Sequence, residues 1–206
     1  NHTLQEAKSI ENVREGEFLL NSNALKSTFK KLAENYSIIH VSTHATSGDY
    51  YTPPAIEFYD ETLYLPEIYG YNLHADLLVL SACKTGLGIV RKGEGAMSLA
   101  RGFSYSGVKN LLVSLWKVND KSTKELMTSF YKDYKKSGNK AEALHTSKLS
   151  YIADETISAS KKSPYYWASF VYIGEVSSLE NNNFNFGWFL IVGFVLIAGY
   201  ILLKKS

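Results

Sequence analysis

Hydrophobic residues along the first 176 positions of the chain follow two different periods. The runs SIIHVST and DLLVLSA are too short for helices, and the second contains the uninterrupted apolar stretch LLVL. A continuous apolar stretch of this length is typical of a strand that is covered on both faces. The later runs NLLVSLW and ASFVYIG predict further strands of the same kind.

Between these runs, apolar residues recur at the spacing of a helix. Leu25, Phe29 and Leu32 stand at positions i, i+4 and i+7, which places them on one helical face. Asn21 and Ser22 precede them, and we expect these two residues to cap the helix. The same reasoning predicts helices over residues 4–13, 94–105, 121–137 and 140–155.

Strand and helix patterns alternate along the chain, which favours a mostly parallel sheet with helices on both faces. One long segment, DYYTPPAIEFYDETLYLPEIYGY, interrupts the alternation. We expect one or two short strands there and a helical turn that begins near Pro66. The predicted fold class is therefore α/β, and reactive side chains in such sheets gather beyond the carboxyl ends of the strands.

The C-terminal stretch FGWFLIVGFVLIAGYILL, residues 186–203, carries no charged residue. At ~1.5 Å of rise per residue it would span about 27 Å as a helix, close to the ~30 Å hydrocarbon core of a bilayer. Trp188 and Tyr200 lie near its two ends, where amphipathic rings favour the membrane interface. We therefore expect a transmembrane helix at 186–203, after a polar linker at 177–185.

The residues that flank this helix predict its orientation. Lys204 and Lys205 follow it in a basic tail, residues 204–206, whereas the preceding flank carries Glu175 and Glu180. Positively charged flanks tend to stay in the cytoplasm. The domain at residues 1–176 is then expected on the outer side, periplasmic in a Gram-negative bacterium, with the cytoplasmic face as the alternative. The chain begins with asparagine rather than methionine, which indicates a piece of a longer protein.

Composition narrows the range of functions. A net charge of +2 gives no sign of a nucleic-acid surface. A single cysteine excludes a disulfide framework and a multi-cysteine zinc site. The glycine-rich stretch GLGIVRKGEG matches neither common nucleotide-binding motif. His40 and His44 fall in a strand pattern, where residues four apart are separated by about 13 Å, too far for one zinc ion. We expect no metal and no organic cofactor.

Two of the predicted strands run directly into reactive side chains. His44 follows SIIHVST, and Cys83 follows DLLVLSA. A thiol needs a base or a positive neighbour to form a thiolate near neutral pH, and histidine suits that task. From the residues alone Cys83 can be either a nucleophile or a buried filler at a strand end. We expect His40, inside its strand, to face a neighbouring element.

Four segments together resemble one known family. They are IIHVSTHA, LLVLSACKTGLG, GEGAMSLARGFSYSGVKNLLVSLWKVND and PYYWASFVYIGE. Their order and spacing resemble the CHAT domain family, within the caspase–separase superfamily of cysteine peptidases (clan CD-like). The resemblance implies a caspase-like three-layer sandwich with a catalytic dyad of His44 and Cys83. It also implies that the backbone N–H groups of Cys83 and Ala45 bind the oxyanion, with Ala45 where the family often has glycine.

The resemblance further implies hydrolysis of a peptide bond in a partner protein, without metal or cofactor. CHAT domains commonly follow tetratricopeptide repeats, so such repeats are expected upstream in the full chain. Two alternatives remain: a catalytically inert scaffold tethered to the membrane, and an acyltransferase or thioesterase that uses the same dyad.

The expected specificity rests on Asp120 in the segment SLWKVND. This segment resembles the part of separases in which an acidic residue lines the pocket for the side chain before the scissile bond. A carboxylate there predicts cleavage after arginine or lysine. Asp120 also precedes a predicted helix and is a candidate N-cap. Glu94 is the second candidate for the substrate pocket.

Overall fold

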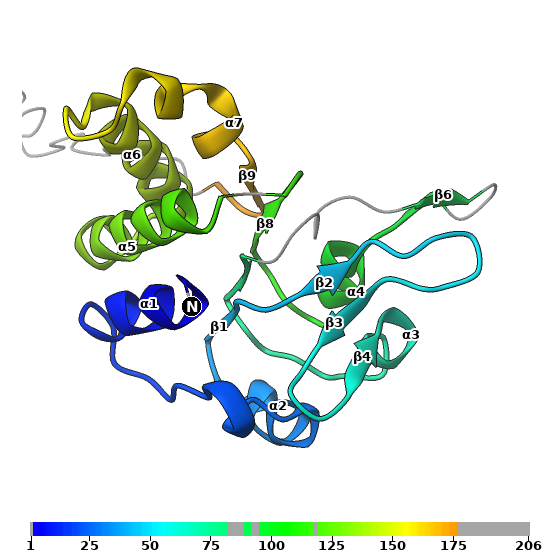
Figure 1. Cartoon of the computed structure of the whole chain (residues 1–206). Helices are drawn as coiled ribbons and strands as arrows, with labels where there is room; N and C mark the ends of the chain where they lie inside the picture. The colour runs from blue at the N-terminus through cyan, green and yellow to red at the C-terminus, as the bar shows by residue number, and fades with distance from the viewer. Residues whose placement is uncertain (1, 82–88, 92–94, 118, 177–206) are drawn as a thin grey trace, which may run out of the picture. The chain divides into compact units, whose positions relative to one another are not determined.

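The computed structural model describes residues 2–81, 89–91, 95–117 and 119–176, and its central feature is a four-stranded sheet (Figure 1). The strand order is β1-β5-β8-β9. β1 pairs with β5 and β5 with β8 in parallel, whereas β9 runs antiparallel to β8. The predicted mostly parallel sheet is therefore confirmed. The strands span Ile38–Val41 (β1), Leu77–Leu80 (β5), Leu111–Ser114 (β8) and Phe170–Ile173 (β9).

Helices cover both faces of this sheet and form a three-layer sandwich (Figure 1). Successive side chains of a strand point to opposite faces, so each face of the sheet has a hydrophobic cluster of its own. Leu78 and Leu80 belong to one cluster, and Leu77 and Val79 belong to the other. The first cluster includes residues of α2 (Lys26–Leu32), α3 (Leu65–Ile68) and α4 (Leu99–Tyr105), and the second includes residues of α1 (His2–Glu11), α5 (Asp120–Ser137) and α6 (Lys140–Ala153).

A second, small sheet follows β1 in the chain. It has the antiparallel order β2-β3-β4. β3 and β4 are the short strands expected in the segment DYYTPPAIEFYDETLYLPEIYGY. Pro66 stands in the first turn of α3, as expected. The bounds are Ala45–Thr46 (β2), Ala55–Glu57 (β3) and Thr62–Tyr64 (β4), and the remaining short helices are η1 (Asn21–Asn23), η2 (Ala33–Asn35), η3 (Ala159–Lys162) and α7 (Pro164–Trp167).

The prediction of a helix over residues 94–105 is wrong in its first part. Gly95–Met97 form strand β7, which pairs antiparallel with β6 (Ile89–Arg91), and α4 begins only after Ser98. The Oγ of Ser98 accepts a hydrogen bond from the backbone N–H of Arg101 at 3.2 Å. The hairpin and the serine N-cap together outweigh the helical spacing of the sequence.

The expected cap of the second helix is also wrong. Asn21 and Ser22 lie in η1, one turn before the start of α2 at Lys26. The carboxylate of Asp60 caps this helix instead, because its Oδ1 accepts a hydrogen bond from the backbone N–H of Lys26 at 2.8 Å. A cap supplied by a residue 34 positions away leaves no local signal in the sequence.

The long helix α5 follows its prediction closely. Leu126 and Phe130 are buried in the second cluster, and Tyr134 packs against that cluster. Gly138 ends the helix in the left-handed conformation, with φ of 69°, which glycine adopts without a Cβ penalty.

The predicted transmembrane helix lies outside the described residues. Within the described ranges, no helix has the length and apolar character needed to cross a bilayer. Residues 177–206, which include the predicted linker, helix and basic tail, are not among them. The membrane anchor therefore remains a prediction.

Candidate functional site

The carboxyl ends of β1 and β5 lie level with each other. The parallel register pairs Val41 with Leu80, and the backbone N–H of Ser81 donates to the carbonyl of Val41 at 3.0 Å. In the sequence, His44 comes three positions after Val41, and Cys83 comes three positions after Leu80. Cys83 lies outside the described residues, so the predicted dyad is described here only on its histidine side.

The chain at His44 is held by contacts with β3. The carbonyl oxygen of His44 accepts a hydrogen bond from the backbone N–H of Glu57 at 2.9 Å. The hydroxyl of Thr43 donates to the carbonyl of Glu57 at 2.8 Å. These two bonds attach two consecutive residues of the turn between β1 and β2 to Glu57, while the side chain of His44 is exposed.

The next peptide group has a defined direction. His44 and Ala45 share a trans peptide bond, in which the C=O and the N–H point opposite ways. Since the carbonyl of His44 points toward β3, the N–H of Ala45 points away from it. Ala45 pairs with Ile56 at a position that exchanges no backbone hydrogen bonds across this ladder. This donor is therefore directed away from its sheet partner, as an oxyanion donor requires.

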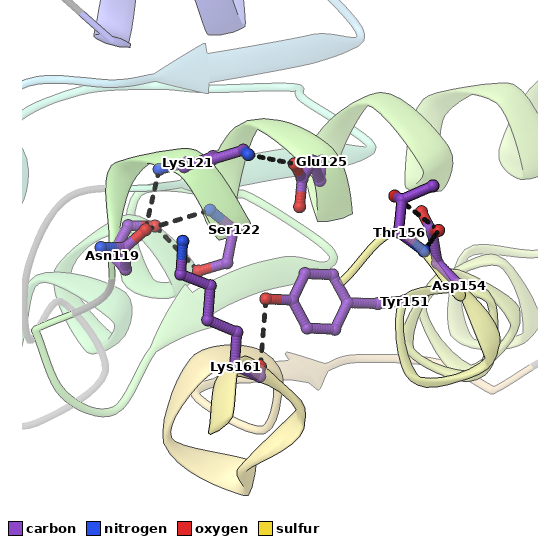
Figure 2. A network of polar contacts seen from close by, with 8 residues as sticks. All are labelled: Asn119, Lys121, Ser122, Glu125, Tyr151, Asp154, Thr156 and Lys161. Carbon is purple, nitrogen blue, oxygen red and sulfur yellow. Dashed lines mark hydrogen bonds and ion pairs between the residues drawn. The ribbon is translucent and has the colours of Figure 1, made fainter. Parts of the chain in front are cut away.

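Of the two residues predicted to line the substrate pocket, Glu94 and Asp120, the structure describes only Asp120. Glu94 lies outside the described residues. Asp120 is the first residue of α5, and the expectation that it caps this helix is wrong. Asn119 is the N-cap: its Oδ1 accepts hydrogen bonds from the backbone N–H groups of Lys121 and Ser122 at 3.1 and 3.4 Å (Figure 2). The side chain of Asn119 thus binds the free backbone N–H groups at the start of the helix. The carboxylate of Asp120 is exposed.

Asp120 lines an open hollow of about 630 Å³ between the start of α5 and the segment from η3 to α7. This hollow is mixed in charge, because lysines share its wall with the carboxylate. Its other lining residues are Lys117, Asn119, Lys121, Lys161, Tyr165 and Tyr166. Within the described part of the chain, Asp120 forms no ion pair with these lysines.

A smaller cavity of about 220 Å³ adjoins the same end of α5. The hydroxyl of Tyr151 donates to the backbone carbonyl of Lys161 at 3.2 Å and joins α6 to η3 (Figure 2). Burial, followed by the nearby carboxylate of Glu125, raises the pKa of Tyr151 above its ordinary value. The hydroxyl therefore stays a donor at physiological pH. We interpret its contact with Lys161 as a structural link between α6 and η3.

A buried polar cluster beside the ends of β1 and β5 was not predicted. His40 points from β1 toward α1 and α5, as expected of a side chain that faces a neighbouring element. Its Nε2 lies 3.1 Å from the Oγ of Ser81 and 3.3 Å from Oε1 of Glu6, and its Nδ1 lies 3.1 Å from the hydroxyl of Tyr131. The other oxygen of Glu6 accepts a hydrogen bond from the hydroxyl of Ser42 at 2.6 Å.

The one sequence signal for this cluster is the position of Glu6, one helical turn before the buried Ile10. Residues four apart share a helical face, so Glu6 had to face the core and needed a partner there. Neither this cluster nor any other part of the described ranges contains three or more histidine, cysteine or acidic side chains arranged to hold a metal ion.

Comparison with known protein families agrees with this architecture. The model of the CHAT domain family matches residues 1–175, which is nearly the whole of the described region. No curated protein matches the chain. CHAT domains are linked to caspase-like cysteine peptidases, whose α/β fold has a mostly parallel sheet flanked by helices. The chain belongs to the CHAT domain family.

Proposed function

We propose that the chain is a cysteine endopeptidase whose catalytic dyad consists of His44 and Cys83. The register of the sheet carries this proposal. Val41 and Leu80 are paired neighbours 39 positions apart (80 − 41), and His44 and Cys83 are also 39 apart (83 − 44). Both residues therefore follow their strands by the same number of positions, on neighbouring parallel strands that lie about 4.8 Å apart.

The proposed reaction is the hydrolysis of a peptide bond through an acyl-enzyme. The imidazole of His44 takes the proton of the Cys83 thiol, and the thiolate attacks the carbonyl carbon of the substrate. The backbone N–H groups of Ala45 and Cys83 hold the oxyanion. The imidazolium then gives its proton to the leaving amine as the C–N bond breaks, and water hydrolyses the thioester. The direction of the Ala45 N–H, away from β3, supports this assignment.

The proposal includes cleavage after a basic residue, with the Asp120 carboxylate as its binding partner. Lys117 and Lys121 line the same hollow, and in the described part of the chain neither forms an ion pair with this carboxylate. An arginine side chain suits the carboxylate better than a lysine does, because its planar fork forms two parallel hydrogen bonds with a carboxylate. We therefore expect arginine to be preferred over lysine at the residue before the scissile bond.

The proposal also includes a membrane anchor at residues 186–203, with the peptidase domain outside the cytoplasm. There the peptidase domain acts on a partner protein. The hydropathy of the segment supports the anchor, and the lysines after it support the orientation. Protease treatment of intact spheroplasts should degrade the domain. Complete protection of a folded domain would instead assign it to the cytoplasmic face.

The test of the peptidase activity compares the chain with two variants, Cys83→Ala and His44→Ala. Each variant should abolish cleavage of candidate partner proteins, because each removes one half of the covalent route. N-terminal sequencing of the fragments identifies the cleaved bond. His145→Ala is the matched control, since His145 is an exposed histidine on α6, outside the site.

Cleavage that persists in Cys83→Ala would remove the nucleophile from this site. A wild-type chain that binds its partner without cleaving it would favour the inert scaffold. Turnover of an acyl thioester without peptide cleavage would favour the acyltransferase or thioesterase.

A further inference from the structure

The buried cluster around His40 connects the two strands that lead to the proposed dyad. His40 stands four positions before His44, and Ser81 stands two positions before Cys83. The imidazole of His40 and the hydroxyl of Ser81 join these segments at 3.1 Å. Ser81 is 7% exposed and Glu6 is 4% exposed, so the contact forms where a polar group needs a partner.

The two ring nitrogens of His40 face different partners. Nδ1 lies 3.1 Å from the hydroxyl of Tyr131 on α5, and burial, followed by the carboxylate of Glu6, raises the pKa of this hydroxyl. Nε2 lies 3.1 Å from the Oγ of Ser81 and 3.3 Å from Oε1 of Glu6. Each hydroxyl can donate to or accept from the nitrogen that it faces. The two nitrogens therefore have separate tasks: Nδ1 binds α5, and Nε2 binds the chain that leads to Cys83.

We propose that His40 is a positioning residue for the peptidase reaction: its Nε2 holds Ser81, two positions before Cys83 in the sequence, against β1. This inference rests on the proposed function. The backbone bond from Ser81 to Val41 fixes the spacing of the strands, and the side-chain bond adds a second point of attachment that restricts rotation of the chain about Ser81. A misplacement of about 1 Å in a reacting group can cost roughly 100-fold in rate.

Two amide substitutions separate the tasks of the ring nitrogens. The side-chain amide nitrogen of glutamine is separated from the backbone by the same number of bonds as Nε2 of histidine. The amide nitrogen of asparagine is separated from it by the same number of bonds as Nδ1. His40→Gln therefore retains a hydrogen-bonding group toward Ser81, whereas His40→Asn retains one only toward Tyr131. Both variants replace the same ring with an uncharged amide, so each is the control for the other.

We expect His40→Asn to lower kcat by roughly 10- to 100-fold with little change in KM. His40→Gln should restore most of this loss. Ser81→Ala removes the other half of the contact and should lower kcat as His40→Asn does. It deletes a single oxygen, and it supplies the test if the asparagine variant does not fold.

A second measurement does not depend on a known substrate. Cys83 is the only cysteine of the chain, so its alkylation by iodoacetamide can be followed by mass at pH 7. The thiolate is the reactive form, and a correctly placed His44 increases its amount. We expect His44→Ala, His40→Asn and Ser81→Ala to slow alkylation to a similar rate, with His40→Gln near the wild type.

Equal rates for the glutamine and asparagine variants would overturn the inference, as would losses that only follow a lowered Tm. Slowing by His44→Ala alone, with both His40 variants at the wild-type rate, would overturn the positioning role and leave the dyad intact. A wild-type rate in His44→Ala would overturn the dyad, and the positioning role with it.

Discussion

Tyr131→Phe tests the other side of the His40 ring, because it removes one oxygen atom from the buried cluster. Tyr131 is 2% exposed, and its hydroxyl lies 3.1 Å from Nδ1 of His40. Its ring packs on Phe130 with the centroids 5.1 Å apart, and the substitution retains that contact. The perturbation is thus limited to one hydrogen bond between α5 and β1.

The size of the effect follows from the group that is left behind. A neutral hydrogen bond contributes about 0.5–1.5 kcal/mol net, and a buried polar group that loses its hydrogen-bond partner costs about 1–3 kcal/mol. The side chain of His40 is 15% exposed, which allows Nδ1 partial hydration. We therefore expect the free energy of unfolding to fall by about 1–2 kcal/mol. In a domain of this size that lowers Tm by about 2–8 °C.

The assay is urea unfolding of the whole chain, followed by circular dichroism. A mild non-ionic detergent is present throughout, because residues 186–203 are apolar. Tyr134→Phe is the matched control: Tyr134 lies on the same helix and stacks on Phe130, and its hydroxyl forms no hydrogen bond to the described residues. The control should stay within about 0.5 kcal/mol of the wild type. Equal losses in the two variants would refute the reasoning, as would a strong fall in kcat for Tyr131→Phe, which keeps the bond to Ser81.

Three further predictions concern single residues. Asp60→Ala should destabilise the chain near neutral pH, because the backbone N–H of Lys26 lowers the pKa of the Asp60 carboxyl; this difference in urea midpoint should disappear as the pH falls below the lowered pKa. Gly107→Ala should cost at least about 2 kcal/mol in urea unfolding, since Gly107 has φ of 106° and a Cβ there would overlap the carbonyl of Leu73. Asp120→Asn should abolish the arginine preference in a peptide library and leave Tm unchanged; an unchanged preference would exclude this role.

The four central strands could be predicted from the sequence because each is a short apolar run that ends in polar or small residues. An apolar strand covered on both faces leaves a signal within its own residues. Features that depend on a distant partner leave no such signal. The cap of α2 comes from Asp60, and Gly95–Met97 form a strand only because Ile89–Arg91 pair with them.

The residues of the candidate site also differ in whether the sequence carries a local signal for them. His44 and Ala45 could be named because they follow a predicted strand and match a family motif. The cluster of Glu6, His40 and Ser81 could not, because its members come from three separate segments that only the folded chain brings together. The sequence does not distinguish Asn119 from Asp120 as the N-cap of α5, since both types of side chain cap helices well and the pattern does not fix the first helical residue.

The register of β5 against β1 is a problem that hydrophobicity alone does not solve. All four residues of β5 are buried and apolar, so a slip by one position would still bury apolar side chains on both faces. The polar groups at the end of the strand remove this ambiguity. A slip by one position would turn the Oγ of Ser81 to the other face of the sheet, away from His40, and leave a largely buried imidazole nitrogen without its partner. The contact between His40 and Ser81 therefore specifies the register on which the proposed dyad depends.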